Sequence, residues 1–153
     1  MLAIQDAIPG NHCWGCGTLN PQGLHIKSYW DGDGTVCRFQ PAPHHAAGPP
    51  HILNGGIIAA VIDCHSICTA FADSYRAAGR DLGSAPLLWN VTASMRIDYL
   101  SPAPLVEAVE LRARVVEVRG RKRTIACTLA SAGVDRARAE VVAVQVDPGW
   151  LGA

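Results

Sequence analysis

Two glycines and a carboxylate at helical spacing form the most reactive group of residue types in this sequence. Gly55 and Gly56 follow Asn54, and Asp63 comes seven residues after Gly56. Glycines let a ligand approach bare backbone amides, and a helix that starts here adds unpaired N–H donors and a positive dipole, so the place suits an anion or a developing oxyanion. Seven residues are about two helical turns, so Asp63 lies on the face of Gly56, roughly 10 Å further along.

Asp63 stands in an otherwise apolar segment, where a carboxylate is costly unless it is paired or functional. Two interpretations stay open: a buried Asp satisfied by a cap or an ion pair, or a reactive carboxylate of an active site. His65 would point about 200° around the helix from Asp63. We expect it to be a satisfied core or interface histidine.

The element that carries these residues is a long helix. Between Gly56 and Gly79 the chain contains neither Pro nor Gly, and it is apolar nearly all round until Asp73. The pattern predicts a helix over 55–78, enclosed on most sides, with Gly79 at its C-cap. The stretch 52–72 is nominally long enough to span a bilayer, but a central Asp is costly in lipid, so we expect no membrane partner.

The rest of the chain alternates as strands do. We predict a hairpin with strands in 24–30 and 35–39 around a turn at 31–34, then strands over 89–100, 106–118, 121–131 and 136–146, the last three in a meander. One buried helix wrapped by a curved antiparallel sheet of about five to six strands is an α+β arrangement. We expect a single domain over 1–153, with an irregular N-terminal segment over 1–23.

Composition bears on partners and compartment. Thirteen basic residues balance thirteen acidic ones, which argues against a nucleic-acid partner. Hydrophobic residues make up 49% and charged residues 17% of the chain, and such a composition predicts that some surface is buried in a homo-oligomer. The N-terminus shows no export pattern, so the six cysteines predict reduced thiols in a cytoplasmic protein.

Cys13 and Cys16, with His12 adjacent, have the spacing of half a zinc site. No second pair at suitable spacing follows, so we expect no metal and interpret the segment as a tight turn of small residues. A metal site shared across a dimer and a redox pair remain alternatives. Cys64 and Cys68 are interpreted as small hydrophobes at the helix core.

Three segments resemble hotdog-fold acyl-CoA thioesterases of the phenylacetate-degradation (PaaI-like) type. His51-Ile-Leu-Asn-Gly-Gly-Ile-Ile-Ala-Ala-Val-Ile-Asp63 resembles the family's His-Gly-Gly-x6-Asp segment. The later segment over 91–102 resembles a strand ending in Tyr-Leu-x-Pro, and 13–24 is similar to an N-terminal Cys-x-x-Cys-Gly and Asn-Pro-x-Gly-Leu pattern of a subset. The three together cover nearly the whole chain in order.

The resemblance implies a dimer or tetramer with active sites between subunits. Gly55, with Gly56, would polarise the thioester carbonyl, and Asp63 from the opposite subunit would act as general base on water or as nucleophile. Thr92 stands where relatives place a Ser or Thr that orients the water or the carboxylate. From its residue type alone, Thr92 is an ordinary strand residue.

Two positions depart from the family. Asn54 stands where the family most often has His; it can cap the helix, but any role that needs an imidazole is lost. Gly48 stands where many relatives carry Asn or Gln, and His51 or Asn54 would be the substitutes. A basic turn at Arg119, Arg121, Lys122 and Arg123 is either a solvated turn or a contact to the phosphates of CoA.

The function this implies is hydrolysis of an acyl-CoA thioester by water, with no cofactor beyond the CoA of the substrate. The alternative is a hotdog protein that binds acyl-CoA without hydrolysing it, as a sensor or carrier. A hotdog hydratase is disfavoured, because Asp63 and His65 do not reproduce its loop-and-helix motif.

Overall fold

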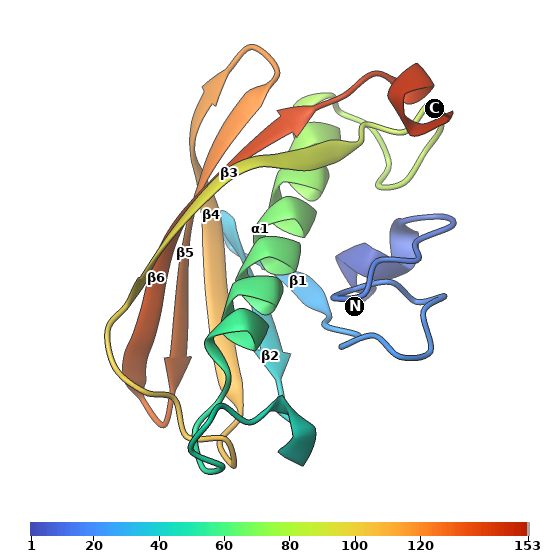
Figure 1. Cartoon of the computed structure of the whole chain (residues 1–153). Coiled ribbons are helices and arrows are strands. Elements are labelled where there is room, and N and C mark those ends of the chain that lie inside the picture. The colour runs from blue at the N-terminus through green and yellow to red at the C-terminus, as the bar shows by residue number, and fades with distance from the viewer. Residues whose placement is uncertain (153) are drawn as a thin grey trace.

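One long helix lies against a six-stranded antiparallel sheet in the computed structural model, which describes residues 1–152 (Figure 1). The strand order is β1-β2-β4-β5-β6-β3. The elements are η1 (Ile4–Ala7), β1 (Ser28–Asp31), β2 (Gly34–Phe39), η2 (Pro43–His45), α1 (Gly55–Ala77), β3 (Asn90–Tyr99), β4 (Val109–Arg119), β5 (Lys122–Ser131), β6 (Val134–Gln145) and η3 (Pro148–Gly152). This arrangement confirms the predicted α+β fold, with one helix held in a curved sheet.

Helix α1 begins and ends where its sequence indicates. The side chain of Asn54 accepts hydrogen bonds from the amides of Gly56 and Ile57, at 2.7 and 3.3 Å, and so caps two of the unpaired donors of the first turn. At the other end Gly79 has φ +62°, the left-handed conformation that stops a helix. The helix ends at Ala77, one residue before the end of the predicted span 55–78.

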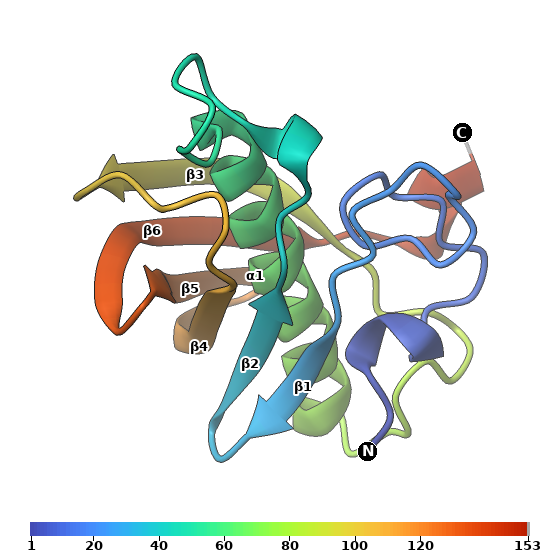
Figure 2. The ribbon, with the colours of Figure 1, turned by 90° about the horizontal axis from the view of Figure 1, so that it is seen from below.

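The two halves of α1 are enclosed to different extents. Figure 2 shows the sheet curving around the helix, with the N-terminal segment on its other side. Most residues from 65 to 75 are buried, whereas Gly56 is exposed and Ile57, Ala60 and Cys64 are half-buried. By length and composition α1 could cross a membrane, but it packs on the sheet of its own chain. The predicted enclosure on most sides is thus confirmed for its second half.

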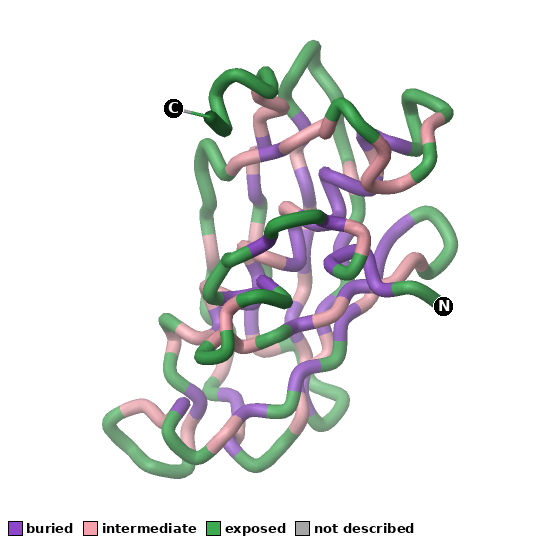
Figure 3. The backbone as a smooth tube through the Cα atoms, turned by 90° about the vertical axis from the view of Figure 1, so that its right-hand side faces the viewer, coloured by how far each residue is buried: buried purple, intermediate pink, exposed green. Residues whose placement is uncertain are grey.

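The core lies between α1 and the central strands, and the loops at both ends of the molecule are exposed (Figure 3). Leu111 of β4 and Ile125 and Leu129 of β5 are fully buried, and each contributes roughly 1.5–3 kcal/mol by leaving water. Strands β4, β5 and β6 form the predicted meander. Strand β3 pairs with β6 and forms one edge of the sheet.

Two predicted strands start later than expected, one because the N-terminal loop binds its backbone amides and one because a turn precedes it. The amides of Leu24 and Ile26 donate to the carbonyls of Trp14 and Gly15, at 2.8 and 3.2 Å, so this stretch is bound to the N-terminal loop and β1 begins at Ser28. The strand predicted from 106 is shortened by a turn, in which the Glu107 amide donates to the Pro104 carbonyl at 3.3 Å, and β4 begins at Val109.

A buried chain of polar groups ties η1, β1 and β2 to α1 around His65. Gln5 donates to the Ser28 hydroxyl at 2.9 Å, and that hydroxyl lies 2.8 Å from Nδ1 of His65. On the other side, Nε2 of His65 lies 3.3 Å from the Thr35 hydroxyl, which lies 2.6 Å from that of Thr69. Thr69 donates to the His65 carbonyl at 2.8 Å. This confirms the prediction that His65 is a satisfied core histidine.

Candidate active site

The carboxylate of Asp63 on α1 meets the hydroxyl of Thr92 on β3. Oγ1 of Thr92 donates to Oδ1 of Asp63 at 2.6 Å. A register irregularity between Thr92 and Ser94 falls at this point of β3, and such bulges re-aim side chains next to active sites. Within residues 1–152 the carboxylate has neither an ion pair nor a capping role, so it is held by one neutral donor and keeps Oδ2 as a further acceptor.

Asp63 and Thr92 line a largely apolar pocket of about 220 Å³. Its walls come from α1, the start of β3 and the N-terminal loop, and they include the side chains of Ile67, Phe71 and Trp89. A concave apolar site with a few placed polar groups is the usual form of a small-molecule site. The pocket can therefore take an apolar group beside a carboxylate in its wall.

At the start of α1 one backbone amide of the described residues, that of Gly55, is free to donate a hydrogen bond to a ligand. The Gly56 amide is taken by the side chain of Asn54, whereas within residues 1–152 the Gly55 amide has no acceptor. Tyr99 was not predicted as a site residue, although it belongs to the Tyr-Leu-x-Pro motif. Its hydroxyl donates to the Gly55 carbonyl at 2.8 Å, and a Cβ on Gly55 would lie 3.4 Å from its ring. Tyr99 thus holds this turn in place.

Gly55 and Asp63 do not form one site within a single chain. Eight helical residues separate them by about 12 Å along the axis, which is too far for both to reach one reacting carbonyl. The structure thus brings together Asp63 and Thr92, and it places Gly55 at a separate point of the same open helix face.

The other predicted binding residues lie at opposite ends of α1. His51 is exposed in the loop before the helix. Arg119, Arg121 and Lys122 are exposed on the β4–β5 hairpin, which lies near the C-terminal end of α1 (Figure 1). Two of them have acidic neighbours, since Arg119 lies 2.8 Å from a carboxylate of Glu117 and Arg121 lies 3.5 Å from one of Asp147.

Arg123 differs from the other three basic residues of this turn. Its side chain is only 7% exposed, and Nε lies 3.0 Å from Oδ2 of Asp73 on α1. A buried guanidinium that is paired in this way fastens β5 to the helix. The exposed basic group of the hairpin therefore consists of Arg119, Arg121 and Lys122.

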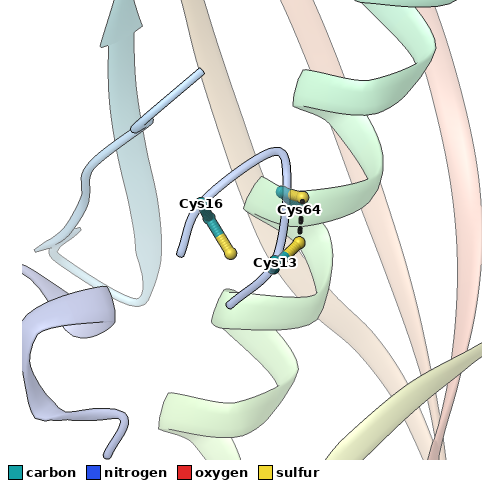
Figure 4. A group of neighbouring side chains, drawn as sticks. All are labelled: Cys13, Cys16 and Cys64. Carbon is teal, nitrogen blue, oxygen red and sulfur yellow. Dashed lines mark hydrogen bonds between the residues drawn. The ribbon is translucent and has the colours of Figure 1, made fainter. Parts of the chain in front are cut away.

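The N-terminal loop brings two cysteines to a third on α1. The thiols of Cys13 and Cys64 lie 3.6 Å apart and point toward each other, and Cys16 lies beside them (Figure 4). Cys64 packs against the core, as a small hydrophobe would, and its thiol in addition faces the loop. Hydrogen bonds from the thiols of Cys13, Cys64 and Cys68 lower the pKa of the Cys16 thiol. A signal was available, because Cys64 and Cys68 are four residues apart and share a helix face.

Comparisons with known proteins agree with this architecture. The model of the thioesterase superfamily matches residues 51–137. A thioesterase superfamily protein from Shewanella loihica has a similar solved structure, with a TM-score of 0.71 and 35% identity over 94% of this chain and 99% of that one. The PaaI protein of E. coli, from the phenylacetic acid degradation operon, shares the fold at a TM-score of 0.66 and 13% identity over 81% of each chain.

Curated relatives match over part of their length. Acyl-coenzyme A thioesterase THEM4 of Rattus norvegicus is 29% identical over 115 residues, which are 74% of this chain and 44% of that protein. The same enzyme of Xenopus laevis is 33% identical over 96 residues, 63% of this chain and 37% of that protein. The chain thus spans less than half the length of these curated relatives.

Proposed function

The chain belongs to the thioesterase superfamily, and from this premise we propose that it hydrolyses an acyl-CoA thioester to a carboxylate and free CoA. The observation that carries the proposal is the hydrogen bond between Thr92 and Asp63 at the wall of an apolar pocket. A carboxylate held by a neutral hydroxyl keeps its second oxygen for a proton. An apolar pocket beside it suits the acyl chain.

In the proposed reaction Asp63 is the general base. Oδ2 of Asp63 takes a proton from a water molecule while the water oxygen attacks the thioester carbonyl carbon. The Gly55 amide donates to the oxyanion of the tetrahedral intermediate. The C–S bond then breaks, the electron pair leaves with sulfur, and the thiolate of CoA takes up the proton held by Asp63, which restores the carboxylate. Thr92 donates to Oδ1 and so fixes the orientation of the carboxylate.

A second copy of the chain would complete the site. Gly55 and Asp63 lie about 12 Å apart along α1, so the proposal takes Gly55 from one protomer and Asp63 from its partner. Strand β3 is an edge strand with exposed Met95 and Tyr99, and its free backbone groups can pair with another strand. The open first half of α1 borders the same region. These features support a homodimer, or a tetramer built from it.

The exposed basic group of the hairpin is proposed to hold CoA. Arg119, Arg121 and Lys122 carry positive charge at the end of α1 that is remote from Gly55, and guanidinium groups match phosphate oxygens bidentately. In a composite site the hairpin would come from the subunit that supplies Asp63. Water is the second substrate, and CoA enters as part of the thioester.

One observation favours the second candidate, binding of acyl-CoA without hydrolysis. The side chain of Asn54, at the position where the family most often has His, is engaged by the amides of Gly56 and Ile57. It is therefore occupied as a helix cap, and Asp63 with Thr92 would have to activate water alone.

A thiol-release assay over a panel of short, medium and aryl acyl-CoA thioesters separates the two functions. If the chain is a hydrolase, we expect one free thiol for each thioester consumed, in many-fold excess over the protein, for at least one acyl class. Calorimetry with a thioether analogue, which cannot be hydrolysed, measures binding independently. Tight binding with no thiol released over hours would overturn the hydrolase and favour the carrier.

A further inference from the structure

Three thiols from distant parts of the chain lie at the separations that a bound metal ion requires. Cys13, Cys16 and Cys64 place their sulfur atoms within 4.8 Å of one another, and the two closest, of Cys13 and Cys64, are 3.6 Å apart. Zn²⁺ binds thiolates at about 2.3 Å, so two sulfurs at a tetrahedral zinc stand about 3.8 Å apart. The separation of the Cys13 and Cys64 sulfurs is close to that value.

The loop that carries Cys13 and Cys16 is built around this contact. A Cβ on Gly15 would lie 2.3 Å from the sulfur of Cys64, so only glycine lets the loop approach the helix so closely. Asn11 is buried; its side-chain oxygen Oδ1 accepts from the Cys13 amide at 3.0 Å, and its Nδ2 donates to the sulfur of Cys16 at 3.6 Å. N–H donors on ligand sulfurs are typical partners of metal thiolates.

A fourth sulfur stands one helical turn away. Cys68 follows Cys64 at i+4, on the same face of α1; it lies outside the group of three sulfurs within 4.8 Å but lines the same pocket as Cys13, Cys16 and Cys64. Cys68 is buried, so a thiolate there would need a cation beside it. The two remaining cysteines, Cys37 and Cys127, are buried in β2 and β5.

We propose that Cys13, Cys16, Cys64 and Cys68 bind one Zn²⁺ ion in a closed, structural tetrathiolate site. Four sulfur ligands in a tetrahedron favour zinc and leave no open position for catalysis. A disulfide between Cys13 and Cys64 would use two thiols and leave Cys16 and Cys68 without partners. The ion would fasten the N-terminal loop to α1 at the residue that follows Asp63, and so fix one wall of the pocket. The proposal does not depend on the thioesterase activity.

The full chain, purified under reducing conditions, provides the direct test. Elemental analysis is expected to find one zinc per chain. After removal of zinc, titration with Co²⁺ is expected to give the intense visible bands and the sulfur-to-cobalt charge-transfer band of a tetrahedral thiolate site, and added Zn²⁺ is expected to abolish them. Absence of zinc together with absence of these bands would overturn the site. So would iron or copper in place of zinc.

Variants assign the ligands. Cys→Ser at position 13, 16, 64 or 68 is expected to weaken zinc binding by at least about 100-fold, because loss of a ligand exceeds the roughly 10–100-fold effect of an outer contact. The matched control, Cys127→Ala, is expected to leave zinc affinity unchanged. If a cluster variant does not fold, the cobalt spectrum of the unaltered chain still decides the question. Equal zinc affinity in all five variants, or a Cys13–Cys64 disulfide in a zinc-free chain, would contradict the proposal.

Discussion

Asp63 and His65 stand two residues apart on one helix and have opposite surroundings. Asp63 is half-buried and faces the pocket, and one of its carboxylate oxygens accepts a hydrogen bond from the Thr92 hydroxyl. His65 faces the sheet and is fully buried, and each of its ring nitrogens is hydrogen-bonded to a hydroxyl, that of Ser28 or that of Thr35. A turn of about 200° around α1 is enough to place one titratable group in a candidate active site and the other in the core.

The hydroxyl groups around His65 satisfy both nitrogens of its ring. Thr69 donates to the His65 carbonyl, so Thr35 must donate to Thr69 and accept from Nε2–H of His65. Gln5 donates to Ser28, which leaves the Ser28 proton for Nδ1. The Thr35 hydroxyl also lies 3.5 Å from the Ala113 carbonyl. With the Thr35 proton on the shorter bond to Thr69, the network assigns a neutral imidazole with its proton on Nε2. Asp63, by contrast, retains an unused acceptor, and the unused capacity marks it as the reactive member of the pair.

The largest expected effect separates the two residues by stability. His65→Ala removes a fully buried ring and takes one hydrogen-bond partner from each of the Ser28 and Thr35 hydroxyls, so we expect it to lower the free energy of unfolding by roughly 3–5 kcal/mol. Asp63→Ala, the matched control two residues away, removes one hydrogen bond from Thr92 and is expected to lower it by only about 1 kcal/mol. Urea denaturation measures both. Equal losses would remove the distinction drawn between the two helix faces.

Acid should act on the same core residue. Burial lowers the pKa of His65 to about 4, from 6.5. Below pH 6.5 the unfolded chain takes up a proton that the folded chain does not, so stability falls as the pH drops from about 6.5 to 4, by roughly 3 kcal/mol in total. Above pH 6.5 His65 contributes no pH dependence. Denaturation of the unaltered chain and of His65→Gln at pH 7.5 and 4.5 isolates this part, and an identical loss in both chains would refute it.

Thr92→Val tests whether the hydrogen bond from Thr92 to Asp63 at the pocket wall contributes to catalysis. The variant keeps the shape of the side chain and removes the hydrogen bond to Asp63, so we expect kcat to fall roughly tenfold with KM unchanged. Thr92→Ser restores the hydroxyl and is expected to recover most of the loss. A valine variant with full kcat would show that the Asp63 carboxylate needs no orientation by this hydroxyl.

The smallest effect is expected at the start of the helix. Asn54→Ala removes the cap of the Gly56 and Ile57 amides and should cost about 1 kcal/mol of stability, while Asn54→Ser should cost little. Thermal unfolding of the two variants measures this. Equal melting temperatures for both variants and the unaltered chain would mean that the cap is dispensable.

Local signals predict the elements well and their partners poorly. The ends of α1 follow from Asn54 and Gly79, because capping and glycine conformation depend on neighbours in sequence. The late start of β1 does not, because it depends on Trp14 and Gly15 taking the amides of the hairpin segment. Pairing of β3 with β6 is likewise a long-range choice that no local pattern specifies.

The candidate site divides in the same way. Gly55 and Asp63 are marked by residue type and spacing, whereas the role of Thr92 came from the family resemblance, since a threonine on a strand is unremarkable by itself. The thiol cluster joins Cys13 and Cys64 across 51 residues. Spacing within each pair indicates a shared face or turn, but only the fold brings the two pairs together.

The central claim is that Asp63 activates water while the rest of the site binds the substrate, and Asp63→Asn tests it most directly. Thiol release in a single turnover is expected to fall roughly 10²–10⁴-fold, the range for loss of a general base, with unchanged affinity for a thioether analogue and unchanged stability. Asp33→Asn, an exposed change in the β1–β2 turn, is expected to keep full activity. Thiol release by Asp63→Asn within a few-fold of the unaltered chain would contradict the account.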